Sequence, residues 1–248
     1  MRKLYTPKKE PMRLAILLSG SGSTALHIIK NHTKNFMVAC LFSDNKLSKA
    51  ESIASEFKIP LKINDIKEFY KNKGLQSIKD MKVRNEFDLE TKKWLLQNKV
   101  DVVALAGYMS LVTSPICDSY VTLNSHPADL TIKQNGKRKY VGAHAVLDCV
   151  LSGEKEILTS IIWVNLDCDE GPILVRSKPV KIPNINGMSL EEKKQMADKV
   201  QEQLKKEGDY PAYIAALDLL AQGRIEADEI NNVFIDGVNS PNGINLAE

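Results

Sequence analysis

The 248-residue sequence predicts an α/β protein with a mostly parallel sheet flanked by helices. Two observations support this fold class. Short apolar runs, typical of buried strands, alternate with longer amphipathic stretches, typical of the helices that connect parallel strands. In addition, the apolar run over residues 14–18 leads into a glycine-rich turn and then into a helix start, as in the first crossover of a parallel sheet.

The first half of the chain contains the clearest strand candidates. Residues 100–106 are the clearest candidate for a central strand, and Gly107 after them allows the chain to turn. Residues 64–83 are polar and rich in lysine, so we expect helix and loop there. The expected strands are residues 14–18, 36–42, 60–63, 100–106 and 121–123, and the expected helices are residues 25–30, 47–57 and 84–98.

The second half carries local signals at the ends of its elements. Ser189 followed by Glu192 is a capping box that starts a long helix. Gly223 is placed to end a helix over residues 210–222, and Asp236-Gly237 is typical of a type I′ turn in a hairpin. We also expect a helix over residues 143–151 and strands over residues 157–165 and 173–182.

The composition excludes several classes of protein. Hydrophobic residues make up 43% and charged residues 26% of the chain, as in an ordinary globular protein. The net charge of +3 comes without a basic stripe of interleaved aromatics, so nucleic acid is not an expected partner. The four cysteines lack the Cys-x-x-Cys spacing of zinc sites, so no metal is expected. No apolar segment reaches membrane-spanning length.

The basic N-terminus resembles a signal peptide only superficially. The apolar run over residues 14–18 is too short for one, and it leads into glycines rather than into a cleavage site. We therefore expect a cytoplasmic protein with a solvated basic arm over residues 1–12. A single domain is expected over residues 13–248, because no convincing linker interrupts the pattern of strands and helices. The expected oligomeric state is a monomer or a homodimer.

The turn from Gly20 to Ala25 allows three interpretations. It follows a strand and starts a helix, so backbone N–H groups at the helix end can bind an anion. It also fits the dinucleotide-binding fingerprint, with Asp44 near the place of a ribose-binding acid, which makes an NAD-dependent oxidoreductase an alternative. The third interpretation is a tight turn that needs glycine for its backbone conformation alone.

Three polar side chains near predicted strand ends form the main candidate catalytic site. Asn124 and His126 are two positions apart, so on extended backbone both point to the same side. The Asn124 amide can donate to an oxyanion, and His126 can transfer protons near neutral pH. Asp169 lies in a loop before Gly171-Pro172, where its carboxylate would favour the imidazolium. Each of these residue types is also common in loops that have no catalytic role.

Asn124-Ser125-His126-Pro127, with Asp169-Glu170-Gly171-Pro172 downstream, resembles the active-site signature of the folate-dependent formyltransferases. The resemblance extends over residues 14–238 and implies the Rossmann-like formyltransferase fold. It also implies that Asn124, His126 and Asp169 are catalytic. In this family the functional Asp stands two residues before Gly-Pro, which selects Asp169 rather than Asp167.

The same resemblance implies binding residues. The motifs are most similar to those of family members that formylate glycinamide ribonucleotide, whose glycine-rich turn binds the substrate phosphate. This implies a phosphate site at Gly22, Ser23 and Thr24, where Thr24 stands in place of the usual Asn. His144 matches a position near the site, Glu207 matches a substrate-binding Glu, and a lysine-rich insertion over residues 133–139 departs from the family pattern. The implied folate-binding residues are Arg84, Met109, Ser110 (in place of an Arg), Leu111, Val112 and Asn124.

The implied activity is transfer of a formyl group from 10-formyltetrahydrofolate, a co-substrate, to the amine of glycinamide ribonucleotide in de novo purine synthesis. The expected partners are these small molecules, without nucleic acid, membrane or metal. A formyltransferase for another amine, such as an amino sugar, and the NAD-dependent oxidoreductase are the alternatives. Relatives that act on methionyl-tRNA or hydrolyse formyltetrahydrofolate normally carry a further domain, so we do not expect either activity.

Overall fold

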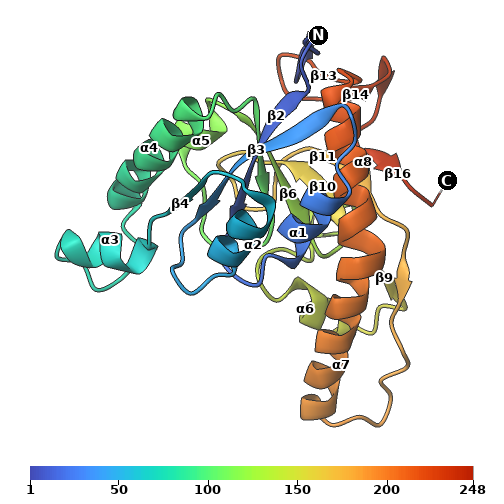
Figure 1. The fold of residues 1–248 in the computed structure, drawn as a ribbon. Helices are drawn as coiled ribbons and strands as arrows, with labels where there is room; N and C mark the ends of the chain where they lie inside the picture. Colours follow the sequence, from blue (N-terminus) through green and yellow to red (C-terminus); the bar gives the residue numbers. More distant parts are fainter. Residues whose placement is uncertain (248) are drawn as a thin grey trace. The chain divides into compact units, whose positions relative to one another are not determined.

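The computed structural model describes residues 1–247 and contains two compact units (Figure 1). The N-terminal unit comprises residues 7–124, and the C-terminal unit comprises residues 1–6 together with residues 125–247. The predicted fold class, a mostly parallel sheet flanked by helices, is confirmed. Strand β6 (Val121–His126) starts in the N-terminal unit, and its last two residues belong to the C-terminal unit.

The N-terminal unit is built on parallel strands in the order β6-β5-β2-β3-β4. Residues 14–18 of the inner strand β2 are fully buried, which explains why this segment is continuously apolar. Its strands are β2 (Met12–Leu18), β3 (Phe36–Ser43), β4 (Leu61–Ile63), β5 (Val102–Leu105) and β6. Its helices are α1 (Ser23–Lys30), α2 (Ala50–Phe57), α3 (Ile66–Asn72), α4 (Met81–Gln97) and α5 (Ser114–Cys117).

The C-terminal unit is mainly antiparallel in its strand pairing. Its helices are α6 (Ala145–Leu151), α7 (Leu190–Leu204), the π-helix η1 (Lys205–Asp209) and α8 (Tyr210–Ala221). Strands β1 (Arg2–Lys3), β13 (Ile225–Ala227), β14 (Val233–Ile235) and β15 (Val238–Asn239) form one sheet. The other strands are β7 (Lys133–Gln134) with β8 (Lys137–Arg138), β9 (Glu156–Ile157) with β12 (Val180–Lys181), and β10 (Ser160–Trp163) with β11 (Ile173–Arg176) and β16 (Ile244–Asn245).

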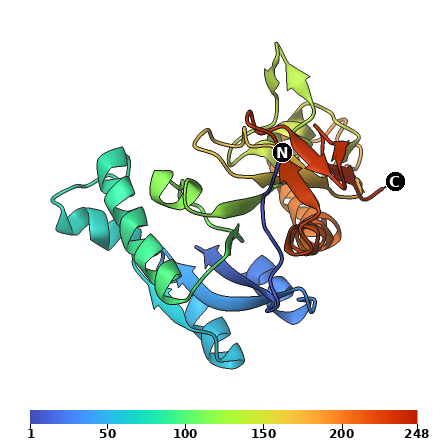
Figure 2. The same ribbon diagram turned by 90° about the horizontal axis from the view of Figure 1, so that it is seen from above.

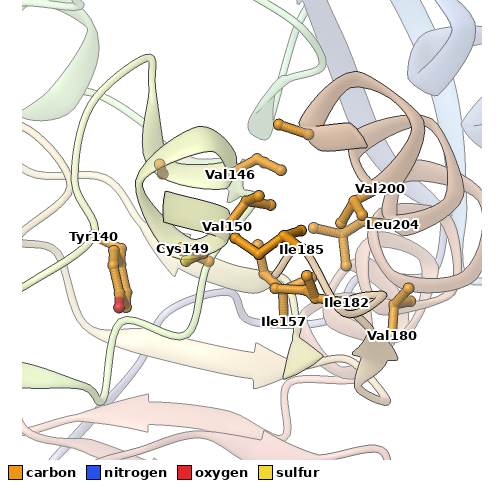
Figure 3. Close-up of a cluster of buried hydrophobic side chains, with 13 residues drawn as sticks. Tyr140, Val146, Cys149, Val150, Ile157, Val180, Ile182, Ile185, Val200 and Leu204 are labelled. Atoms are coloured by element: carbon orange, nitrogen blue, oxygen red, sulfur yellow. The ribbon is translucent and has the colours of Figure 1, made fainter. Parts of the chain in front are cut away.

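A buried apolar cluster joins α6 and α7 to strands β9 and β12 in the C-terminal unit (Figure 3). Val146 and Val150 come from α6, and Val200 and Leu204 come from α7, each at helical spacing on one face. Tyr140, which is 1% exposed, lies at the edge of this cluster. The cluster therefore fixes the segment that leads from the β7–β8 hairpin into α6.

Several local predictions are confirmed in detail. Ser189 and Glu192 form the reciprocal bonds of a capping box at the start of α7. Asp236 and Gly237 both have positive φ, of 53° and 78°, as a type I′ turn requires. Gly223, with φ of 66°, follows the end of α8. Each of these features depends on contacts between residues close in sequence, so it forms independently of how distant segments pack.

Other predictions were wrong in their extent. Residues 157–165 and 173–182 are each divided into two strands that pair in different sheets, and Pro179 interrupts the second because it lacks an N–H donor. The helix expected from residue 47 starts at Ala50, and the one expected from Arg84 starts at Met81. Within the expected solvated arm, Arg2 and Lys3 are exposed and form strand β1, whereas Leu4 and Tyr5 are buried at 8% exposure.

Candidate active site

His126 is buried at the end of strand β6, at 3% exposure, with an acceptor at each ring nitrogen. Nε2 lies 2.7 Å from the backbone oxygen of Tyr140, and Nδ1 lies 3.4 Å from Oδ2 of Asp169. A carbonyl oxygen only accepts, so Nε2 carries a proton and donates it to Tyr140. With Asp169 ionised, Nδ1 also faces an acceptor. Only the imidazolium has an N–H donor for each of these two acceptors.

Asp169 is held as an anion by its neighbours. Burial alone would raise the pKa of this carboxyl, but hydrogen bonding from His126, the positive charge of His126 and the Gly142 N–H together leave the pKa below its ordinary value. The Gly142 N–H donates to Oδ2 over 2.7 Å. One carboxylate oxygen therefore receives both the imidazole contact and a backbone hydrogen bond.

The turn that carries Asp169 has an unusual backbone. Asp169 has φ of 55°, a left-handed conformation that Asp tolerates better than most residues. At Gly171 an added Cβ would lie 2.0 Å from the backbone oxygen of Trp163, so only glycine allows this close approach. The Trp163 N–H donates to the Pro172 oxygen over 2.9 Å, which ties the turn to the end of β10.

Asn124 lies on the same strand as His126, two residues earlier, and is partly exposed. Side chains two residues apart on a strand project to the same face, so its amide and the imidazole share one side of β6. Asp167, which the sequence offers as a competitor of Asp169, is exposed, and its backbone N–H bonds to the Asn165 side chain. The catalytic role of Asn124, His126 and Asp169 stays a prediction.

Asp209, in the π-helix η1, is a second carboxyl of the C-terminal unit, besides Asp169, whose pKa is shifted from its ordinary value. Burial raises the pKa of Asp209 to about 6, against the opposing effects of the Thr159 hydrogen bond and the charges of Lys205 and His126. Thr159 Oγ1 donates to Asp209 Oδ1 over 2.5 Å. Glu207, on the same turn, is exposed and accepts a hydrogen bond from Gln203. Single π turns are frequent at functional sites.

Replacing Asp209 with Asn is expected to stabilise the protein at pH 8. The folded-state pKa is raised, so the native carboxyl contributes stability below its ordinary pKa, and that contribution is lost as the pH rises through about 6. The gain in the free energy of unfolding should be on the order of 1 kcal/mol, because the side chain is partly exposed. Urea unfolding at pH 8 and pH 5 measures it. A gain that is equal at both pH values would contradict the assignment.

The glycine-rich turn lies at the start of helix α1 in the N-terminal unit. Gly22 is the N-cap residue with φ of 66°, and an added Cβ would lie 2.5 Å from Ile53 Cδ1. Among residues 1–247, no side chain caps α1, which leaves its first backbone N–H groups available to an anion. Thr24 is buried at 7% exposure. At Ser23 and Thr24 the backbone, rather than the Thr24 hydroxyl, is therefore suited to bind a phosphate.

Residues 107–112 form a loop after strand β5 that presents apolar side chains to the surface. Met109 is 75% exposed and Leu111 is 55% exposed, whereas Val112 is buried at 8%. The loop is held to the end of strand β2 by a hydrogen bond, because the Met109 N–H donates to Ser19 Oγ over 2.8 Å. Two exposed large apolar side chains on one loop are candidates for contact with an apolar ligand.

Arg84 lies beneath this loop in a buried polar network. The guanidinium is 2% exposed and donates through Nη2 to Asp88, at 2.8 Å, and to the Tyr108 hydroxyl, at 3.1 Å. Its Nε and Nη1 have no hydrogen-bond partner among residues 1–247. The helix expected to begin at Arg84 starts earlier, at Met81, so Arg84 lies in its second turn and its side chain is buried.

Ser110 donates to Oδ2 of Asp44 over 2.5 Å, in the place where the family usually has an Arg. Asp44 is 3% exposed. Its carboxylate is therefore engaged within the unit, below the surface that a ribose would reach. This placement counts against a dinucleotide-binding role for Asp44.

His144 is exposed at the N-cap of α6 and lines a groove of about 320 Å³ between α6 and α7. The opposite wall carries Glu191, Lys194 and Asp198 of α7. Among residues 1–247, neither His144 nor Glu207 forms a hydrogen bond or an ion pair with His126 or Asp169. Within the same residues, no three His, Cys, Asp or Glu side chains group as a metal site would require.

Sequence reasoning missed the groups that complete the His126–Asp169 pair. Two of them are backbone groups, the Tyr140 oxygen and the Gly142 N–H, and residue type does not predict which backbone groups will contact a side chain. The third is Arg138, whose guanidinium contacts the Asp169 turn. Arg138 lies within the lysine-rich insertion, and the unusual position of that insertion between His126 and Gly142 was the one signal available.

The fold and the site define a class of protein. Strand β6 of the sheet carries an amide and a buried imidazole, and the imidazole is paired with a carboxylate. This set of groups is suited to acyl transfer. The sequence matches the formyl transferase family model over residues 12–207, and the chain belongs to this family.

Comparison with individual proteins gives the same family. The chain is 25% identical to the phosphoribosylglycinamide formyltransferase of Haemophilus influenzae over 91% of this chain and 94% of that protein. It is 27% identical to a trifunctional purine biosynthetic protein of Chironomus tentans, but spans only 15% of that protein's length. Among solved structures, the phosphoribosylglycinamide formyltransferase of Coxiella burnetii has a TM-score of 0.71 at 22% identity, covering 95% of this chain and 99% of that one. This structural likeness concerns the fold.

Among residues 1–247, none of the helices combines the length and apolar character needed to cross a membrane.

Proposed function

We propose that this enzyme transfers the formyl group of 10-formyltetrahydrofolate to the amine of glycinamide ribonucleotide. The observation that carries the proposal is the buried His126, with both ring nitrogens facing acceptors and Asn124 on the same face of β6. Membership in the formyl transferase family and the nearly full-length match to the Haemophilus influenzae enzyme support the choice of substrates. A cytoplasmic location is proposed with it.

In the proposed reaction the amine nitrogen attacks the formyl carbon, and a tetrahedral intermediate forms. Asn124 donates its amide N–H to the oxygen that becomes negatively charged, and the imidazolium of His126 adds a fixed positive charge. The bond from the formyl carbon to the folate nitrogen then breaks. The amine loses one proton and the folate nitrogen gains one, so no proton is gained or lost overall.

The hydrogen bonds of His126 restrict how it can transfer that proton. Nε2 donates to the Tyr140 oxygen, and Nδ1 faces Asp169. A substrate atom must therefore replace one of these acceptors before the imidazolium can donate to it. Until then His126 acts through its charge, and Asp169 keeps that charge in place.

Substrate binding is proposed in the N-terminal unit. Backbone N–H groups at Gly22, Ser23 and Thr24 would bind the phosphate of the ribonucleotide at the uncapped start of α1. Met109, Leu111 and Val112 would pack against the folate, with Arg84 and Ser110 setting the polar environment beneath it. Asn124 would contact the formyl oxygen. His144 and Glu207 are proposed only as outer contacts of the substrate.

A formyl-transfer assay with competing amines tests the proposal. Purified enzyme is given 10-formyltetrahydrofolate with either glycinamide ribonucleotide or a nucleotide-linked amino sugar, and the deformylated folate is measured. We expect kcat/KM to favour glycinamide ribonucleotide by about a hundredfold or more, since its polar groups would pair with a site built for them.

Two outcomes would contradict the proposal. Turnover with the amino sugar alone would reassign the acceptor while keeping the family. Saturable NAD binding that is abolished by Asp44→Ala, without formyl transfer, would support the oxidoreductase. We expect no such binding, because the Asp44 carboxylate is buried and bonded to Ser110.

A further inference from the structure

The insertion over residues 133–139 folds into a hairpin of strands β7 and β8 (yellow-green in Figure 2). Its turn is Asn135-Gly136, with φ of 52° and 79°, as the type I′ turns of two-residue hairpins require. Lys133 and Lys137 are exposed, whereas Arg138 at the base of the hairpin is 12% exposed. The hairpin thus has a solvated tip and one inward-facing cation.

Arg138 contacts the backbone of the turn that carries Asp169. The guanidinium donates to the backbone oxygen of Asp169 and, over 2.9 Å, to that of Gly171. Its Nε lies 3.8 Å from Glu170. A planar guanidinium can bond two carbonyl oxygens of one turn at the same time, which the point charge of a lysine does not reproduce. Arg138 therefore fixes the turn on both sides of Glu170.

The residues that follow Arg138 contact the catalytic pair itself. The Tyr140 oxygen receives the Nε2 proton of His126, and the Gly142 N–H donates to the Asp169 carboxylate. Tyr140 is anchored by its ring in the apolar cluster of Figure 3 and by its hydroxyl on Glu154. Residues 138–142 thus hold the imidazole, the carboxylate and the backbone of the Asp169 turn.

The Asp169 turn needs such support because its conformation is strained. A residue other than glycine in the left-handed region persists only when its surroundings fix it. Asp169 has φ of 55°, and its carbonyl oxygen accepts a hydrogen bond from the Arg138 guanidinium. Loss of Arg138 would release the carbonyl oxygens of both Asp169 and Gly171.

We propose that Arg138 is a positioning residue that keeps the Asp169 carboxylate on His126, and that the base of the inserted hairpin at Arg138 thereby belongs to the active site. The inference rests on the proposed function, in which Asp169 is the partner of His126. It assigns a role to a segment that departs from the family pattern.

The test compares Arg138→Ala and Arg138→Lys with Lys137→Ala, which removes an exposed cation from the same hairpin. We expect Arg138→Ala to lower kcat by about tenfold to a hundredfold through misplacement of the carboxylate, with KM nearly unchanged. Arg138→Lys keeps the charge but loses the two-carbonyl geometry, so its kcat should fall between wild type and Arg138→Ala. Lys137→Ala should match wild type.

Two further measurements separate positioning from a general loss of structure. NMR titration of the Asp169 carboxyl should show its pKa rising towards the ordinary value in Arg138→Ala but not in Lys137→Ala. In the Asp169→Asn background, Arg138→Ala should lower kcat little further, since it acts through a carboxylate already removed. A wild-type Asp169 titration in Arg138→Ala, or losses of kcat that multiply in the double variant, would overturn the proposal. The titration needs no substrate, so it decides about Arg138 even if glycinamide ribonucleotide proves not to be the acceptor.

Discussion

Replacing His126 with Ala is expected to lower kcat by about a hundredfold to ten-thousandfold while folate binding stays nearly intact, because the loss falls on proton transfer and on charge. The imidazole is buried and contacts Tyr140 and Asp169, and residues 107–112, the proposed folate-binding loop, form neither of these two contacts. The loss should therefore appear in kcat rather than in the folate dissociation constant.

Steady-state formyl transfer and equilibrium titration with a folate analogue measure the two quantities for His126→Ala. His32→Gln is a suitable control, since His32 is an exposed histidine outside the site. Near-wild-type turnover of His126→Ala would reject His126 as the catalytic group. If His144 partly replaces His126, the double variant His126→Ala/His144→Ala should be much slower than His126→Ala alone. The ratio of their kcat values tests this.

Replacing Asp169 with Asn is the second change with a large expected effect. Asn tolerates the left-handed backbone and keeps an oxygen for the Gly142 N–H, so the variant mainly removes the negative charge. Without that charge the imidazolium loses its partner, and the midpoint of the His126 titration should move to lower pH. Turnover should fall by about a hundredfold or more.

The pH dependence of stability gives an independent check on Asp169. Its folded-state pKa is below the ordinary value, so the ionised carboxyl contributes stability above its ordinary pKa, and this is lost as the pH falls through the lowered pKa. The wild type should therefore be more stable than Asp169→Asn at neutral pH, with a difference that shrinks in acid. NMR titration of His126 in both proteins and urea unfolding at several pH values test both statements. An unchanged His126 titration would leave Asp169 as a turn residue only.

Local sequence patterns determined most of the secondary structure. The apolar run over residues 14–18, the capping box from Ser189 and the Asp236-Gly237 turn each depend on contacts within a few residues. Such patterns specify where a strand is buried, where a helix begins and which way a hairpin turns. Strand pairing depends on distant partners, and accordingly the extents of the strands near residues 157–182 were predicted poorly.

The sequence by itself determined the family and the three side chains proposed for catalysis, because the order of Asn124, His126 and Asp169 along the chain is distinctive. Only the tertiary structure decided what those side chains face. It placed Tyr140 O at one nitrogen of His126, the Gly142 N–H on Asp169, and Arg138 on the Asp169 turn. It also buried Arg84 and Asp44, for which the sequence had offered folate-binding and ribose-binding roles. The physical reason is that backbone groups have no sequence signature, and the burial that sets a charge's behaviour comes from residues distant in the chain.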